Sequence, residues 1–167
     1  MSTNKKAKII LGAVILIILI IGGIIMFINK NKKDRYEAFL DSGQLYADDQ
    51  QYDKSVIDFR KAVKLYPDRY DAHAPLAVAL VFAGINNPNT STSEAYYREA
   101  IALIDEYLEK IPTDNPDAWV HRGMAYYQLK DYEQAELNFA HAAAADPSDT
   151  IAKSLLENVR TKLKSIE

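Results

Sequence analysis

Residues that could carry out chemistry are few and widely spaced in this sequence. It contains three histidines, His73, His121 and His141, and no cysteine. A chain without cysteine can form no disulfide, no thiol nucleophile and no cysteine-bound zinc site. The sequence also has no His-x-x-x-His pair, no glycine-rich phosphate loop and no recognisable set of nucleophile, base and orienting residue. We therefore predict that the chain has no catalytic or metal site, is not an enzyme, and uses no cofactor or small-molecule substrate.

Charge is divided unevenly along the chain, although the net charge is only −3. Residues 1–35 carry seven basic residues and one acid, whereas residues 36–167 carry 13 basic and 22 acidic residues. An acidic domain repels phosphate backbones, so we expect no nucleic-acid partner. It favours neutral or basic partners instead. The basic residues of the N-terminal part are suited to contact lipid head groups.

One unbroken apolar run, Ile9 to Ile28, covers 20 residues without a charge. At a rise of about 1.5 Å per residue, such a helix spans roughly 30 Å, the thickness of a bilayer core. In lipid, every backbone group must be satisfied within the segment, which makes a helix the only available structure. We therefore predict a transmembrane helix at 9–28, a basic tail at 1–8, a basic linker at 29–35 and contact with the lipid bilayer through residues 9–28.

A cleaved signal peptide is the main alternative for this run. Signal peptides have an apolar core of about 7–15 residues and a cleavage site of small residues. The run here is longer, and a lysine-rich stretch at 29–33 follows it, so an uncleaved signal anchor is favoured. Three basic residues precede the run and four follow it, which leaves the sidedness of this single-pass arrangement nearly balanced.

Two stretches after the apolar run share one spacing of large, small and aromatic residues. Between 116 and 149 these positions hold Trp119, Gly123, Tyr126, Ala135, Phe139, Ala142 and Pro147, and between 36 and 69 the same offsets hold Phe39, Gly43, Tyr46, Ser55, Phe59, Ala62 and Pro67. This spacing resembles the tetratricopeptide repeat, a pair of antiparallel helices about 34 residues long. The resemblance implies that the small residues let the two helices approach closely and that the aromatic residues fill the space between helices.

A third, irregular repeat is predicted between them, at residues 70–114. Its first helix has His73, Leu76, Ala77 and Leu80 in phase with the pattern, and its second has Ala100, Ile104, Tyr107 and Pro112, displaced by 11 residues. Asparagine, proline, serine and threonine gather at the displacement, so we predict an inserted loop near 84–93, with a helix beginning before Glu94.

The predicted fold is all-α, with one N-terminal transmembrane helix followed by helix-turn-helix repeats in a right-handed superhelix. The repeats cover 36–149, as 36–69, 70–114 and 116–149, because about three are needed to bury a continuous core. Residues 150–167 are predicted to form a capping helix of the kind that ends such arrays. Its apolar stripe holds Ile151, Leu155, Leu156, Val159 and Leu163.

The resemblance also implies a concave groove lined by the first helix of each repeat. The positions assigned to this partner-binding groove are Leu40, Gln44, Val78, Val81, Phe82, Val120, Met124, Tyr127 and Gln128. An apolar centre with an acidic rim, at Glu37, Asp48, Asp71 and Asp117, is typical of a site for another protein or a peptide segment. The alternative is that Val78, Val81 and Met124 pack beneath the inserted loop or the C-terminal helix.

Chaperone-binding members of the family are the best-defined comparison for this groove. They hold a C-terminal carboxylate with a clamp of Lys, Asn, Asn, Lys and Arg. The matching positions here are Leu40, Gln44, Pro75, Asp117 and His121, and none carries the clamp residue. Docking on the acidic tails of heat-shock chaperones is therefore not expected, because an incoming carboxylate would meet no cation.

The layout favours a membrane-anchored adaptor or scaffold that assists assembly or organisation of a membrane-associated complex. Two alternatives stay open at this point. The domain can be a permanent structural subunit of a larger membrane complex, or a preprotein receptor that binds basic presequences at its acidic rim.

Overall fold

A computed structural model describes the backbone of residues 3–88, 91–111 and 115–166, and side chains from Leu11 onward. The described residues form helices and turns and contain no strand, in agreement with the predicted all-α class. The elements in chain order are α1 (Thr3–Asp48), α2 (Tyr52–Leu65), the short 3-10 helix η1 (Tyr70–Ala72), α3 (His73–Asn86), α4 (Ser91–Lys110), α5 (Pro116–Gln128), α6 (Tyr132–Ala145) and α7 (Thr150–Lys164).

The chain divides into two compact units, Met1–Ala38 and Phe39–Glu167. In the first unit, the large apolar side chains from Leu11 to Ile28 are between 45% and 74% exposed. The helix that carries them is long and apolar enough to cross a membrane, and no part of its most apolar window is buried. A core helix of a soluble protein would be covered by other elements. The exposed apolar surface therefore needs another cover, as a membrane span does, although a signal sequence near an N-terminus has the same composition.

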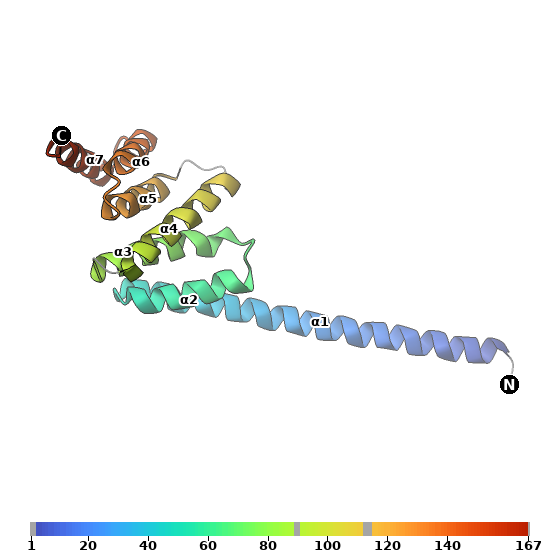
Figure 1. The fold of residues 1–167 in the computed structure, drawn as a ribbon. Coiled ribbons are helices and arrows are strands. Elements are labelled where there is room, and N and C mark those ends of the chain that lie inside the picture. The colour runs from blue at the N-terminus through green and yellow to red at the C-terminus, as the bar shows by residue number, and fades with distance from the viewer. Residues whose placement is uncertain (1–2, 89–90, 112–114, 167) are drawn as a thin grey trace. The chain divides into compact units, whose positions relative to one another are not determined.

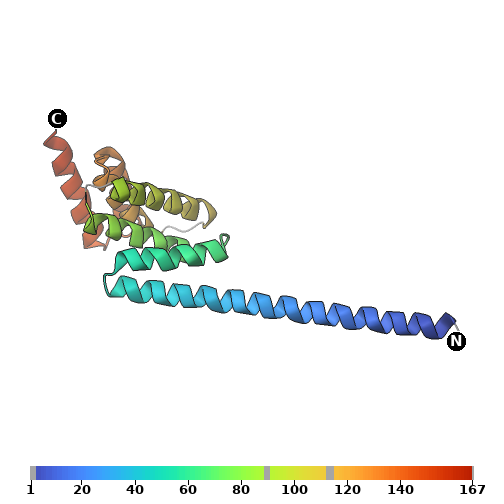
Figure 2. The same ribbon diagram turned by 60° about the horizontal axis from the view of Figure 1, so that its bottom comes forward.

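The second unit consists of antiparallel helix pairs followed by one more helix (Figures 1 and 2). Residues 39–48 of α1 lie against α2, α3 pairs with α4, and α5 pairs with α6. The terminal helix α7 packs on α6, where Ala152 and Val159 have no exposed surface. Asp149 begins α7 as its N-cap, and its carboxylate accepts hydrogen bonds from the backbone N–H groups of Ile151 and Ala152 at 2.7 and 3.1 Å.

Glycine facing an aromatic ring sets the separation within the helix pairs. A Cβ atom added at Gly43 would lie 2.8 Å from the Phe59 ring, and one added at Gly123 would lie 2.7 Å from the Phe139 ring. Both rings are almost fully buried. Only glycine lets these backbones lie so close to the facing rings, which explains why the repeat pattern pairs a small residue with an aromatic one.

Within the inserted loop predicted near 84–93, residues 84–86 and 91–93 are helical, Asn87 and Pro88 are not, and residues 89 and 90 lie outside the described part of the chain. Helix α3 continues to Asn86 and α4 already begins at Ser91. Helix α4 has 20 residues, whereas α6, which holds the same place in the next pair, has 14. Most of the 11-residue displacement therefore lengthens the two helices of the middle pair, and only a short connection separates them.

The lengthened part of the middle pair has its own glycine–aromatic contact. A Cβ atom added at Gly84 would lie 2.5 Å from the Tyr97 ring. Gly84 lies seven residues beyond Ala77 on α3, and Tyr97 lies seven residues before Ile104 on α4. Because the two helices are antiparallel, a step of seven residues forward on α3 and seven residues back on α4, about two turns each, brings Gly84 and Tyr97 opposite one another. The lengthened part of α3 and α4 therefore repeats the small-residue-to-aromatic contact of a regular repeat about two turns further along the pair. The polar residues near 90 gave no sign of this contact in the sequence.

Arg122 of α5 connects three helices. Its guanidinium lies 2.5 Å from the Asp105 carboxylate of α4 and donates a hydrogen bond of 3.4 Å to Asn138 of α6. It also lies over the rings of Trp119 and Tyr126, at 5.6 and 5.7 Å from their centres. A planar cation that stacks on rings and binds a carboxylate holds the third pair against the middle pair.

A polar cluster joins the two helices of the first pair. The hydroxyl of Ser55 donates to the backbone carbonyl of Gly43 at 2.9 Å, and the hydroxyl of Ser42 donates to the Asp58 carboxylate at 2.7 Å. Lys61 pairs with the same carboxylate at 2.7 Å. Burial raises the pKa of Asp58, but the hydrogen bonds from Lys61 and Ser42 outweigh it, so the pKa lies below its usual value.

One methyl group added at Gly84 is expected to lower the melting temperature. Alanine normally favours a helix over glycine by about 1 kcal/mol. Here the new Cβ atom would meet the Tyr97 ring at 2.5 Å, and overpacking a well-packed core costs about 1–3 kcal/mol. Thermal unfolding of the full chain in detergent measures the change, with Gly22→Ala as control because nothing lies within 4 Å of a Cβ there. A higher melting temperature for Gly84→Ala would contradict tight packing of the added layer.

Acid is expected to destabilise the folded chain partly through Asp58. Because its pKa is lower in the folded state, its contribution is fully present above the ordinary aspartate pKa and is lost as the pH falls through the lowered value. The free energy of unfolding, measured in urea from about pH 6 to about pH 3, should therefore fall less steeply for Asp58→Asn than for the wild type. The exposed Asp68→Asn serves as control. Equal slopes for Asp58→Asn and wild type would rule out this contribution.

Candidate functional site

The structure places the nine predicted groove residues at three levels of exposure. Five are partly exposed, Leu40, Val78, Phe82, Met124 and Tyr127, and two are exposed, Gln44 and Gln128. The other two are buried, Val81 with no exposed surface and Val120 with 8%.

Val81 and Val120 are corrections to the predicted groove. Val81 lies in the main apolar cluster of the array, and Val120 packs against Ala142 and Ala152. Because Val81 has no surface and Val120 almost none, neither side chain can contact a partner unless the core opens.

Aromatic side chains from three helices meet at Phe82. Its ring stacks on Tyr52 of α2 at 5.1 Å between ring centres, with an angle of 21° between the planes. His121 of α5 also meets the Phe82 ring edge-on, at 6.0 Å between ring centres and an angle of 71° between the planes. These contacts hold the Phe82 ring in place between neighbouring helices. Tyr52 and His121 were absent from the predicted groove, because the offsets of single helices do not show which rings meet across helices.

His121 is a neutral residue in this environment. Its Nδ1–H donates a hydrogen bond of 2.7 Å to the backbone carbonyl of Asp117, which lies four residues earlier on the same helix. Burial lowers the pKa of His121, although the Asp117 carbonyl and carboxylate act in the opposite direction. The ring borders a cavity of about 40 Å³, together with Ala74, Val78, Ile104, Tyr107, Asn115, Asp117 and Ala118. So small a space does not admit a large side chain, so the Val78 end of the groove is nearly closed.

A larger pocket of about 220 Å³ opens at the other end of the predicted groove. It is lined by Met124, Tyr127 and Gln128 of α5, Phe139 of α6, and Leu155 and Asn158 of α7. The structure thus brings three predicted residues together. It adds a wall from the C-terminal helix, which the sequence had suggested only as a cap. Leu155 and Asn158 are three residues apart, which is the spacing of one helix face and the only signal that could have linked them.

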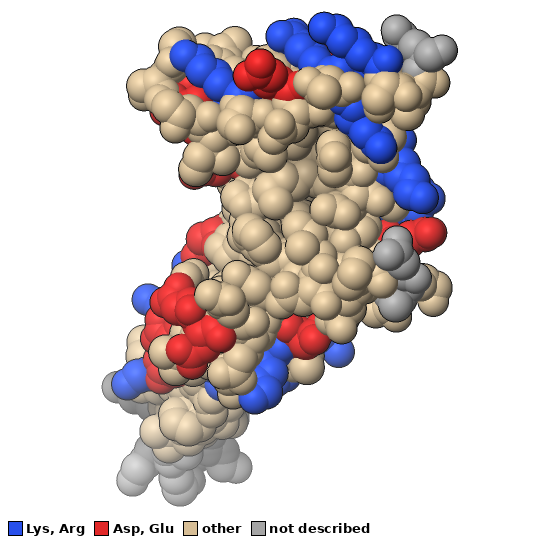
Figure 3. Space-filling view, turned by 90° about the vertical axis from the view of Figure 1, so that its left-hand side faces the viewer, with Lys and Arg blue, Asp and Glu red and all other residues tan. Residues whose placement is uncertain are grey.

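The groove contains acidic and neutral groups but no cation in its two pockets. Neither the lining of the 40 Å³ cavity nor that of the 220 Å³ pocket includes Lys or Arg. Of the predicted acidic rim, Asp48 accepts a hydrogen bond from Gln44 at 2.8 Å and Asp71 pairs with Arg69 at 2.6 Å. Glu37 belongs to the first unit, so its place at the rim stays a prediction. Figure 3 shows one face of the molecule, with uncharged surface at its centre and charged residues at its margins.

Comparisons with known proteins identify the repeats. Family models described as tetratricopeptide repeat match residues 36–69 and 116–149. These bounds are the same as those expected from the residue spacing. The helices α3 and α4 lie between the two matches.

Solved tetratricopeptide domains have a similar arrangement of helices. The Arabidopsis OM64 domain has a TM-score of 0.65 and is 20% identical, with 78% of this chain and 98% of that chain covered. The second domain of human RPAP3, in complex with the HSP70 peptide SGPTIEEVD, has a TM-score of 0.63 and is 15% identical, with 77% and 98% covered. MamA from Desulfovibrio magneticus RS-1 has a TM-score of 0.66 and is 19% identical, with 77% and 66% covered.

Identities at this level show a shared fold and do not transfer a ligand. The chain therefore carries two tetratricopeptide repeats, at residues 36–69 and 116–149, and its helices have the fold of tetratricopeptide repeat domains.

Proposed function

We propose that this chain is a membrane-anchored adaptor that binds a segment of another protein in the predicted groove, at the pocket lined by α5, α6 and α7. The observation that supports this most directly is the 220 Å³ pocket of Met124, Tyr127, Gln128, Phe139, Leu155 and Asn158. Its lining is mostly apolar and includes the two amides of Gln128 and Asn158, which suits one large apolar side chain of a partner.

The charge of the groove argues for a neutral or basic partner segment. The similar RPAP3 domain is described with a peptide that ends in Glu-Glu-Val-Asp. An acidic peptide of that kind needs cations, and the positions of the family clamp here hold Leu40, Gln44, Pro75, Asp117 and the neutral His121. A segment with an apolar anchor and a nearby lysine or arginine meets the Asp117 side of the groove with complementary charge.

The apolar part of α1 supplies the proposed anchor. Its exposed isoleucine-rich surface lies between basic residues at both ends, which is the composition of a single-pass span. Anchoring would keep the groove at the membrane surface and raise its effective concentration toward partners in the same membrane. This combination supports a role in recruiting or organising components of a membrane-associated complex.

Filling the pocket is expected to prevent partner binding without harming the fold. Asn158 is exposed and lines the pocket, so Asn158→Trp is expected to place a ring against the apolar lining. Loss of a central anchor contact typically costs about 2 kcal/mol or more, so recovery of partner on the full chain should fall at least about tenfold. Quantitative affinity capture from detergent-solubilised membranes measures it. The control Thr161→Trp adds the same ring at an exposed position of α7 that lines a different hollow and not this pocket. Equal recovery by Asn158→Trp and wild type would exclude this pocket as the binding site.

Lysines introduced into the apolar run are expected to release the chain from membranes. Ile17→Lys with Ile20→Lys places two charges at mid-span, each at a cost of about 3 kcal/mol for insertion. The measurement is the fraction that stays in the membrane pellet after an alkaline carbonate wash. Ile57→Lys with Leu137→Lys is the control, because these residues are similarly exposed but lie in the repeats.

Two outcomes would count against the anchor. Retention of the double-lysine variant in the pellet would mean that another part of the chain holds it there. A wild-type chain that lacks its first residues by mass spectrometry would show a cleaved signal sequence.

A further inference from the structure

A second pocket lies outside the groove, beside the lengthened end of the middle helix pair. It has a volume of about 200 Å³ and is lined by Pro88, by Ser93, Glu94, Tyr97 and Arg98 of α4, and by Gln128, Leu129 and Lys130 at the end of α5. The first turns of α4 form one wall, and these turns are the ones that exceed the length of α6. The displacement in the middle repeat therefore builds a site that a regular repeat lacks.

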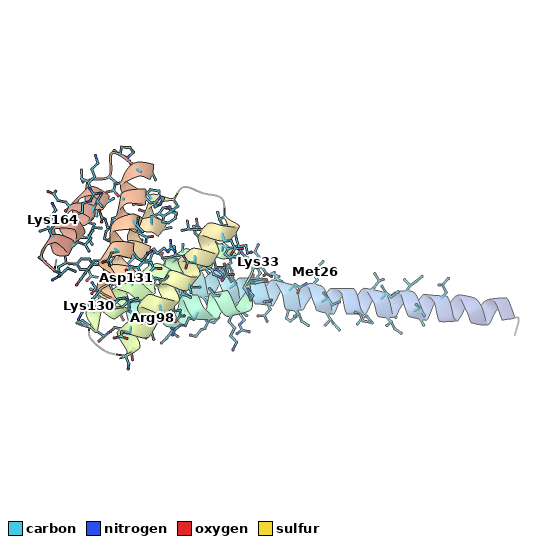
Figure 4. All side chains as sticks on the ribbon, turned by 45° about the horizontal axis from the view of Figure 1, so that its top comes forward. Met26, Lys33, Arg98, Lys130, Asp131 and Lys164 are labelled. Atoms are coloured by element: carbon cyan, nitrogen blue, oxygen red, sulfur yellow. The ribbon has the colours of Figure 1, made fainter. Side chains whose placement is uncertain are left out.

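Two cations converge on this pocket from different helix pairs. Arg98 comes from α4, and Lys130 comes from the turn between α5 and α6, as Figure 4 shows. Among the described residues, neither has an ion-pair partner, whereas Arg60, Lys61, Lys110, Arg122 and Arg160 all do. The charge of Arg98 and Lys130 is available to a ligand.

The neighbouring carboxylates limit the charge of that ligand. Glu94 lines the same pocket, so the lining carries two positive charges and one negative charge. Asp131 lies in an adjoining hollow beyond Arg98 and Leu129, and its carboxylate is engaged as the N-cap of α6, where it accepts from the N–H of Gln134 at 3.2 Å. A net charge of about one suits a single carboxylate better than a phosphate dianion.

The wall of the pocket also contains a buried hydroxyl without a partner. Tyr97 is only 3% exposed, and its hydroxyl makes no hydrogen bond to any described residue. Burial raises the pKa of Tyr97, so the group stays protonated at neutral pH. Unsatisfied buried polar groups are rare in folded proteins, and an ion or a water molecule is one of the explanations for them.

We propose that this pocket binds a single carboxylate side chain of a partner protein, with Arg98 and Lys130 as its cationic contacts. The site is independent of the apolar groove pocket, although Gln128 lines both. The two pockets adjoin at Gln128. A partner whose apolar side chain occupies the groove pocket could therefore place a nearby glutamate or aspartate in the second pocket. The size of the pocket suits one side chain and excludes a helix.

The full chain in detergent allows a direct test, because it has no cysteine of its own. Thr92→Cys, at an exposed position next to the pocket residue Ser93, carries an environment-sensitive fluorophore. The probes are the capped peptides acetyl-Gly-Glu-Gly-amide and acetyl-Gly-Gln-Gly-amide, which differ in one charge, and methyl phosphate. We expect a saturable signal with the glutamate peptide, a much weaker one with the glutamine peptide, and weaker binding of methyl phosphate than of the glutamate peptide.

Variants on the labelled background assign the contacts. Arg98→Gln with Lys130→Asn should weaken binding of the glutamate peptide at least about tenfold, since each removes a charge-assisted contact. Asparagine suits position 130 because that residue has a φ of 64°, a conformation asparagine tolerates. Lys64→Gln removes an exposed, unpaired cation on α2 and should change nothing. Equal binding of both peptides, tighter binding of methyl phosphate, or unchanged binding by the double variant with an unchanged helical CD spectrum would each overturn the proposal.

Discussion

The close approach of paired helices at a glycine facing an aromatic ring is the constraint on which the rest of this structure depends. At Gly43, Gly84 and Gly123 the facing ring occupies the space that a Cβ atom would need. Each contact fixes the separation of two helices and thereby the level at which the next helix can pack. The apolar cluster that unites α2, α3, α4 and α5 follows from these separations. The Arg122 contacts to α4 and α6 can form only because the pairs lie at this spacing.

Most of the fold could be predicted from the sequence because the contacts that define a repeat are local. Trp119, Gly123, Tyr126 and Phe139 belong to one helix pair, so their spacing along the chain is also their spacing in the structure. The run from Ile9 to Ile28 was equally clear, since an apolar surface on every side of a helix leaves few alternatives. The middle repeat was harder. Asparagine, proline, serine and threonine near residue 90 indicate a loop in isolation, and only the Gly84–Tyr97 contact, between residues distant in sequence, shows why helices continue there.

The candidate site could be predicted only in part, because it depends on contacts between repeats. Offsets within one helix assigned Met124, Tyr127 and Gln128 to the groove, and these residues do share a pocket. The same offsets included Val81 and Val120, which neighbouring elements bury. They omitted Leu155 and Asn158, whose position follows from how α7 docks on the preceding pair. That Arg98 and Lys130 line the same pocket could likewise not be predicted from the sequence, because they belong to different helix pairs.

The position of α7 gives the pocket an energetic connection to the end of the array. In repeat arrays each unit contacts mainly its neighbours, and among the described elements α7 packs on α6. Here that helix is held mainly by Ala152, Val159 and the Asp149 cap, and it also supplies Leu155 and Asn158 to the pocket. Any molecule that contacts both α5 and α7 in the pocket binds the arrangement in which α7 is docked, and by thermodynamic linkage it must stabilise that arrangement. Occupancy of the pocket and the docking of α7 on α6 are therefore thermodynamically coupled.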